Sequence, residues 1–312
     1  MPTRTKKQHY VPQFLLRQFA TGTPKKPKIW VLDKSTKDVR LASVRDVAHE
    51  NAFYEFHDPD GTHIDFEHLM EKIDSIGARI IKQVIRSGRL VLSSEDRVWL
   101  SYVVACQMSR TPMIRKDMDN FIEMIIHKWG PNVRMGGDAR TVGEYGQDDS
   151  RFNSLMLLKK DLPAFAKLLQ AKAWFLAEAP PQHPFIISDN PVTRHNMVPR
   201  KGRGNLGLNN DGIEIYLPIS CRFSLHIVCP ILAGIVCMTP DLSAAYTAGI
   251  EEGKPVPMRP ENVTFANSCQ VNWAERYVFG RRRDDLELPL DMLRTNPELM
   301  GGPGVRQRPD EE

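Results

Sequence analysis

The stretch from residue 64 to residue 84 most constrains the fold, because its apolar side chains recur every three or four positions. The recurring residues are Phe66, Leu69, Ile73, Ile76, Ile80 and Val84. This spacing places them on one face of a long helix, and such a face must pack against another layer of structure. The pattern predicts a helix that begins near residue 64 and contributes to the core.

Helical signals continue as far as residue 172. Ser93 and Ser94 can accept hydrogen bonds from the free N–H groups of a helix start, and the acids that follow them favour its positive end. Pro112 interrupts this second helix, because proline lacks a donor and disfavours helix in the preceding residue. We expect further helices over 114–129 and 152–172 and, between them, a loop over 130–149 without periodicity.

After residue 172 the pattern changes to short apolar or alternating runs. These runs predict strands over residues 173–177, 185–188, 213–217, 223–228 and 271–279. Two earlier runs predict a hairpin over 29–44 and a strand over 51–56. The order of the elements predicts an α+β fold, in which a helical layer packs on a mostly antiparallel sheet formed chiefly by the C-terminal half.

The chain is expected to form a single α+β domain over residues 1–295. Its parts are a mixed N-terminal part (1–63), a helical middle (64–172) and a β-rich part (173–285), followed by a disordered tail (296–312). A length of 312 residues with 41% hydrophobic residues is that of a globular protein with a sizeable core.

Cysteine content and hydropathy exclude several classes of protein. The five cysteines include no CxxC pair and no partner histidine at zinc-finger spacing, which argues against a disulfide framework or a structural zinc. No window approaches the roughly 20 apolar residues of a membrane span. We therefore expect a cytoplasmic protein with no membrane contact.

The charge of the chain permits an anionic partner. The formal net charge is +4, and the basic excess is local. Its three clusters are Arg4, Lys6 and Lys7; Arg194, Arg200, Lys201 and Arg203; and Arg281, Arg282 and Arg283. They could guide nucleic acid, although no aromatic residues interleave them for base stacking.

The first twenty residues place a reactive side chain just before an apolar helical face. His9 can act as a base, an acid or a metal ligand near neutral pH, and Lys6 and Lys7 disfavour its charged form. Gln13 lies one helical turn further on and can orient a water or a substrate amide. The structural alternative is a histidine that caps the helix start and a glutamine that serves as a hydrogen-bond tie.

Gln107 and Arg110 form a second candidate pair. They stand three residues apart on a largely apolar helix, so both should approach the interior. A buried arginine requires a carboxylate, for which Glu67 and Asp189 are the candidates. The functional alternative to such a structural ion pair is an arginine that grips a phosphate or carboxylate with two hydrogen bonds.

Asp189 ends an apolar run and stands before Asn190 and Pro191. Carboxylates at strand ends often hold metals or act as bases. Together with Glu67 and His9, Asp189 would form a site for a hard cation such as Mg²⁺ or Mn²⁺. The structural alternative is an Asx turn, in which this side chain caps its own backbone.

Five separated pieces of the chain, taken together, resemble the bacterial domain-of-unknown-function 4238 family. The resemblance implies that these pieces belong to one domain-sized structure in a bacterial protein, and it implies no known activity. The pieces are KQHYVPQFLLRQF (7–19), ENAFY (50–54), QMSRTP (107–112), SDNPV (188–192) and AERYV (274–278).

Two functions from different classes are compatible with these residues. The first is a metal-dependent phosphodiester hydrolase of the nuclease type, active in bacterial defence, in which the basic clusters guide nucleic acid. Its catalytic residues would be His9 as base with Gln13, Gln107 and Arg110, and its metal ligands Glu67 and Asp189. The second is a non-enzymatic ligand- or protein-binding module, in which the same residues form a structural polar network.

Overall fold

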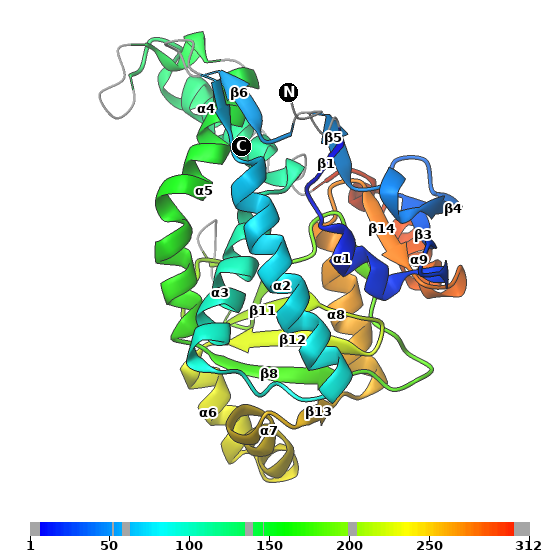
Figure 1. The fold of residues 1–312 in the computed structure, drawn as a ribbon. Coiled ribbons are helices and arrows are strands. Elements are labelled where there is room, and N and C mark those ends of the chain that lie inside the picture. Colours follow the sequence, from blue (N-terminus) through cyan, green and yellow to red (C-terminus); the bar gives the residue numbers. More distant parts are fainter. Residues whose placement is uncertain are drawn as a thin grey trace.

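The protein is an α+β structure in which long helices lie on one side of a five-stranded sheet (Figure 1). This is the fold class that the sequence predicts. The computed structural model describes residues 7–51, 53–57, 63–134, 140–145, 147–198 and 205–302.

The helical layer consists of four long helices, of which the first three are joined by short connections. They are α2 (Glu67–Ser87), α3 (Ser94–Ser109), α4 (Pro112–Trp129) and α5 (Gln147–Gln170). The predicted apolar face of α2 is confirmed, since Ile73, Ile80 and Val84 are buried and α2 packs against α3. Ser93 caps α3 by accepting a hydrogen bond from the backbone N–H of Asp96 at 3.0 Å.

The five-stranded sheet comes entirely from the C-terminal half, as expected. Its strands are β8 (Ala173–Glu178), β10 (Thr193–Asn196), β11 (Ile213–Pro218), β12 (Phe223–Val228) and β13 (Pro255–Pro257). They run in the order β10-β11-β12-β8-β13. The first three pairings are antiparallel, and β13 adds to β8 in parallel.

The two faces of this sheet differ because side chains alternate along each strand. Trp174 of β8 faces the helical layer, where its indole N–H donates to the carbonyl of Leu169 at 2.8 Å. Its neighbour Phe175 faces the other way. The register places Phe175 opposite His226, and His226 opposite Tyr216, so polar groups gather on the face away from the long helices.

Three helices that the sequence did not predict cover that second face. They are α6 (Pro230–Met238), α7 (Pro240–Glu252) and α8 (Pro260–Trp273). In Figure 1, α6 and α7 lie at the bottom of the view, below β8. The expected β-rich part over 173–285 therefore also contains three α-helices. The strand expected over 271–279 is wrong in its first half, because α8 continues to Trp273.

A second sheet joins the two ends of the chain. It contains β2 (Thr21–Thr23), β3 (Lys26–Asp33), β4 (Asp38–Ser43), β9 (Ile187–Ser188) and β14 (Tyr277–Gly280). The predicted hairpin is confirmed as β3 and β4. Because β3 also pairs with β14, the N-terminal and C-terminal parts share a sheet, and the main hydrophobic core draws on residues from Tyr10 to Phe279.

Short elements complete the described chain. They are β1 (Lys7–His9), α1 (Gln13–Leu16), η1 (Arg17–Phe19), η2 (Val44–Asp46), β5 (His49–Asn51), β6 (Glu55–His57), β7 (His63–Asp65), η3 (Val142–Glu144), η4 (Asp284–Leu286), α9 (Glu287–Thr295) and η5 (Pro297–Met300).

Three expected boundaries are corrected by these elements. The first long helix begins at Glu67 rather than near residue 64, because residues 63–65 pair with β6 as a strand. The loop expected over 130–149 contains η3 and the first turn of α5. The tail expected from residue 296 is wrong at its start, since η5 buries Leu299; residues 303–312 lie outside the described residues.

Candidate functional site

Gln8, which the sequence analysis passed over, holds the start of the chain in place. Its side chain is buried and makes two hydrogen bonds with distant elements. The amide nitrogen donates to the carboxylate of Glu67 at 3.2 Å, and the amide oxygen accepts from the backbone N–H of Tyr54 at 2.6 Å. Glu67, expected as a metal ligand, is thus tied to the N-terminal strand.

His9 lies on β1 directly opposite His49 of β5, and the two ring centroids are 5.4 Å apart. Burial and, after it, His49 lower the pKa of His9 to about 4, so the ring is neutral at neutral pH. Its Nε2 atom is buried without a hydrogen-bond partner. The backbone carbonyl of His9 accepts from the hydroxyl of Tyr54 at 2.9 Å, which fixes this strand to the second family motif.

Arg110 and Gln107 approach the interior as predicted, but the carboxylate partner is Asp74 and not Glu67 or Asp189. The guanidinium of Arg110 is fully buried and donates to Asp74 at 2.7 Å and to the Gln107 amide oxygen at 2.8 Å. Burial lowers the pKa of Arg110, but Asp74 outweighs that effect and keeps the pKa above its usual range. The Arg110 guanidinium is therefore charged, and Asp74 and Gln107 accept its hydrogen bonds.

Gln107 also binds the N-terminal segment. Its amide nitrogen donates to the backbone carbonyl of Tyr10 at 3.0 Å. Gln13 is not part of this network, because its side chain accepts from Arg17 on the exposed face of α1 at 3.3 Å. Gln107 and Arg110 thus act together, whereas the structure leaves Gln13 at the surface.

Asp189 is buried and uses both carboxylate oxygens on backbone N–H groups. It accepts from Glu275 at 2.8 Å, Arg276 at 2.7 Å and Tyr277 at 2.8 Å. Burial raises the pKa of Asp189 to about 6, and the three donors and Lys34 oppose that rise. The side chain caps the turn that leads into β14, so the fourth and fifth family motifs meet here.

The three expected metal ligands do not converge. Within the part of the chain that the structure describes, no group of three or more His, Cys, Asp or Glu side chains is placed to hold a metal ion. Tyr10 and Asp189 do line one open hollow of about 520 Å³ with His49 and Glu50, so the N-terminal segment lies beside Asp189. The described residues do not fit Mg²⁺ or Mn²⁺ ligation by His9, Glu67 and Asp189.

A second hollow, of about 370 Å³, lies between the sheet β10-β11-β12-β8-β13 and helices α6, α7 and α8. Apolar and aromatic side chains dominate its wall, as is typical of small-molecule sites. Its lining residues are Phe175, Met197, Glu214, Tyr216, His226, Val228, Leu232, Val236, Tyr246, Met258, Glu261, Asn262, Phe265 and Ala266. We call this hollow the sheet pocket.

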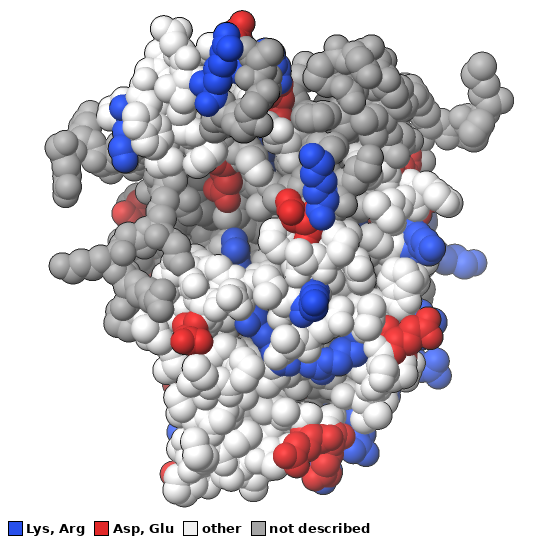
Figure 2. All heavy atoms as spheres, turned by 90° about the vertical axis from the view of Figure 1, so that its left-hand side faces the viewer, with Lys and Arg blue, Asp and Glu red and all other residues white. Residues whose placement is uncertain are grey.

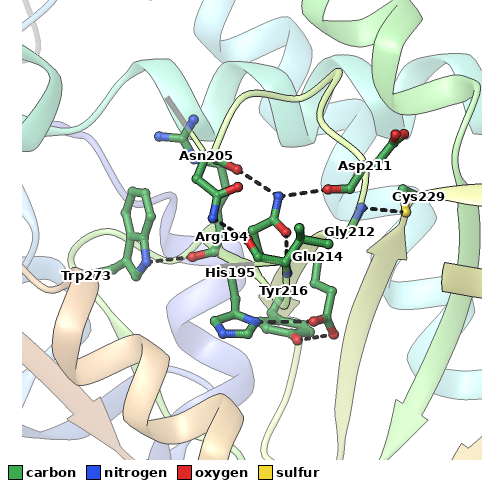
Figure 3. A network of polar contacts seen from close by, with 11 residues as sticks. Arg194, His195, Asn205, Asp211, Gly212, Glu214, Tyr216, Cys229 and Trp273 are labelled. Atoms are coloured by element: carbon green, nitrogen blue, oxygen red, sulfur yellow. Dashed lines mark hydrogen bonds and ion pairs between the residues drawn. The ribbon is translucent and has the colours of Figure 1, made fainter. Parts of the chain in front are cut away.

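A carboxylate is fixed inside the sheet pocket by two neighbours. Glu214 of β11 accepts from the hydroxyl of Tyr216 at 2.5 Å, and its other oxygen lies 3.2 Å from Nδ1 of His195. Figure 3 shows these three side chains directed toward one another. Burial and Glu214 raise the pKa of Tyr216, so its hydroxyl stays a donor.

His226 supplies the second polar group of the sheet pocket. The side chain is 7% exposed, and its Nε2 atom has no hydrogen-bond partner. Burial lowers its pKa to about 3, which keeps the ring neutral at neutral pH. The ring is packed against Tyr216 and Phe175, with centroids 4.6 and 5.1 Å away. Buried polar atoms normally have partners, and a group that enters the sheet pocket could satisfy this nitrogen.

Polar residues within two buried strands are the sequence signal for this site. In β11 and β12 polar residues alternate with Ile and Leu, which places Glu214, Tyr216, Ser224 and His226 on one face of two buried strands. Buried strands otherwise carry apolar residues on both faces. What the sequence cannot provide is the register that sets Tyr216 beside His226.

Each of the expected basic clusters contains a described residue with a local contact, which in the third cluster is the pair of Arg282 with Asp285. Lys7 pairs with Asp46 at 2.7 Å, and Arg194 lies over the ring of Trp273. Arg4, Lys6, Arg200, Lys201 and Arg203 lie outside the described residues. On the face at the left of Figure 1, where α5 lies, basic and acidic side chains are interspersed (Figure 2). No described helix is both long and apolar enough to cross a membrane.

The protein has an α+β fold in which hydrogen bonds join its motif segments in two sets. The first segment is bonded to the second and the third, and the fourth is bonded to the fifth. The sequence matches, over residues 7–284, the family described as "Protein of unknown function (DUF4238)", and the chain belongs to that family. The resemblance found in the sequence is thereby confirmed. Comparison with curated proteins and comparison with solved structures give no match.

Replacing Arg110 should destabilise the protein strongly. Arg110→Met leaves the carboxylate of Asp74 without its cation and the Gln107 oxygen without its donor, and removal of one partner of a buried pair costs about 3–5 kcal/mol. Urea unfolding measures the change. The matched control is Lys254→Ala, which breaks an exposed pair with Glu252 and should change the stability little, because solvent screens surface pairs. Equal losses in both variants would contradict this account.

The neutral state of His226 predicts how stability depends on pH. The pKa of this histidine falls from 6.5 to about 3 on folding, so between these values only the unfolded chain takes up the proton. The free energy of unfolding should therefore decrease as the pH falls, by about 2 kcal/mol from this residue between about pH 7 and pH 5. The lowered pKa of His9 also makes the free energy of unfolding decrease as the pH falls.

The variant His226→Gln should reduce this pH dependence, measured by urea unfolding at both pH values. His183→Gln replaces an exposed histidine and is the matched control, with the wild-type dependence expected. If the His226→Gln protein kept the full wild-type dependence of its unfolding free energy on pH, the ring of His226 would take up a proton as readily in the folded protein as in the unfolded chain.

Proposed function

We propose that this protein is a non-enzymatic ligand-binding module. The polar residues of the family motifs hold its N-terminal segment to the body, and a small molecule occupies the sheet pocket. The observation that carries the proposal is the buried, unpartnered Nε2 atom of His226 at the wall of an aromatic pocket. A ligand that reaches this atom would satisfy it.

The contacts of the motif residues support a structural role for them. Arg110, Gln107 and Gln8 each bond to a group from a distant part of the chain, and both oxygens of Asp189 accept from backbone N–H groups. Both oxygens of Asp189 cap a turn, which supports a structural role for this carboxylate. The alternative, a phosphodiester hydrolase, requires Asp189 to bind a metal ion in addition to these three donors.

The test of the proposal blocks the sheet pocket. Val236→Trp places a large ring into the pocket from α6, and Ile235→Trp places the same ring on the exposed side of the same helix. Small aromatic compounds with cationic, neutral and anionic groups should include at least one that raises the melting temperature of the wild type and of Ile235→Trp but not of Val236→Trp. Circular dichroism checks the fold of both variants.

The same protein preparation tests the hydrolase alternative. Purified wild type and His9→Ala are incubated with DNA, RNA and a generic phosphodiester in Mg²⁺ or Mn²⁺, with and without chelator. The proposal predicts no metal-dependent turnover. Chelator-sensitive turnover that is lost in a folded His9→Ala protein would contradict it and would favour the hydrolase.

A further inference from the structure

We propose that the sheet pocket selects a small organic cation, a primary ammonium on an aromatic or aliphatic body, with the ammonium held between Glu214 and His226. This inference rests on the proposed binding function and adds the chemical class of the ligand. It follows from the charge of the lining, the placement of the carboxylate, the unpartnered imidazole and the aromatic wall.

The charge of the pocket wall favours a cation. Among the described lining residues there are two carboxylates, Glu214 within the pocket and Glu261 at its exposed rim, and no Lys or Arg. A concave site with walls of low polarity strengthens the field of such charges. An anionic ligand would have to lose its hydration beside Glu214 without a compensating cation, which is costly.

The carboxylate of Glu214 is held ready for a ligand. The Tyr216 hydroxyl binds one oxygen, and His195 lies beside the other (Figure 3). A side chain fixed in this way loses little conformational entropy when a ligand binds. Each carboxylate oxygen has two lone pairs, so both oxygens can accept a further hydrogen bond from an ammonium group.

His226 provides a second acceptor in the same pocket. In the neutral tautomer that carries its proton on Nδ1, the unpartnered Nε2 atom has a free lone pair, and an ammonium group supplies three N–H donors. The ring of His226 packs on Tyr216, whose hydroxyl is bound to Glu214, so the imidazole and the carboxylate belong to one connected arrangement. A ligand with several N–H donors can use both acceptors.

The aromatic wall suits the rest of such a ligand. Phe175 and Tyr246 are in edge contact, with ring centroids 5.1 Å apart, and Phe265 stands over His195 at 4.9 Å and beside Tyr216 at 6.3 Å. Aromatic faces attract cations and also bury apolar groups. Phe265 is 43% exposed, which places it at the mouth of the pocket.

Calorimetric titration with three probes of similar size tests the inference. The probes are phenethylammonium, the neutral phenethyl alcohol and the anionic hydrocinnamate. We expect phenethylammonium to bind at least about tenfold more tightly than the other two, because a hydrogen bond to a charged group contributes more than a neutral one. Glu214→Gln should remove this preference, while Glu252→Gln, an exposed carboxylate of α7, should leave it intact.

The outcomes separate the ligand class from the binding function. Binding of phenethyl alcohol or hydrocinnamate as tightly as phenethylammonium, blocked by Val236→Trp, would overturn the cation assignment and leave the binding function in place. A preference for phenethylammonium that persists in a folded Glu214→Gln protein would overturn the role of Glu214 and with it the proposal. Absence of binding by all three probes would count against the cation and the binding function alike.

Discussion

The buried pair of Arg110 and Asp74 is the interaction on which the rest of the structure depends. A guanidinium without contact to water is tolerated only when its charge and its donors are matched, so α2 must bring Asp74 to the end of α3. Gln107 is fixed by the same guanidinium and holds the carbonyl of Tyr10. One buried cation thereby sets the mutual position of two long helices and the N-terminal segment, and the first and third family motifs meet there.

Much of the helical half could be predicted from the sequence, because its signals are local. The apolar spacing of α2, the Ser93 cap and the inward face of Gln107 and Arg110 depend on residues within one or two helical turns. The partner of Arg110 could not be predicted, since the choice of Asp74 depends on how α2 and α3 pack. The sequence analysis expects no helix at α6, α7 and α8, although each begins with proline, which favours the first position of a helix.

The candidate site was predicted less well, for a related reason. The sequence favours titratable residues in the family motifs, such as His9 and Asp189, but the backbone of His9 pairs with β5 and the Asp189 carboxylate caps a turn. The sheet pocket depends on strand register, which places His226 beside Tyr216 and Phe175 only after three antiparallel strands have paired. A polar residue inside an apolar strand is a better guide to this site than any motif, because burial of such a residue is costly unless a partner or a ligand satisfies it.

The central claim is that the motif network is structural and is separate from the sheet pocket. Hydrogen–deuterium exchange of a Gln107→Leu protein tests it most directly, because this change removes the donor to Tyr10 and the acceptor for Arg110 while leaving the pocket wall intact. The account predicts faster amide exchange in residues 7–19, with exchange in β11 and β12 as in the wild type. Unchanged exchange in residues 7–19 of this variant would contradict the account.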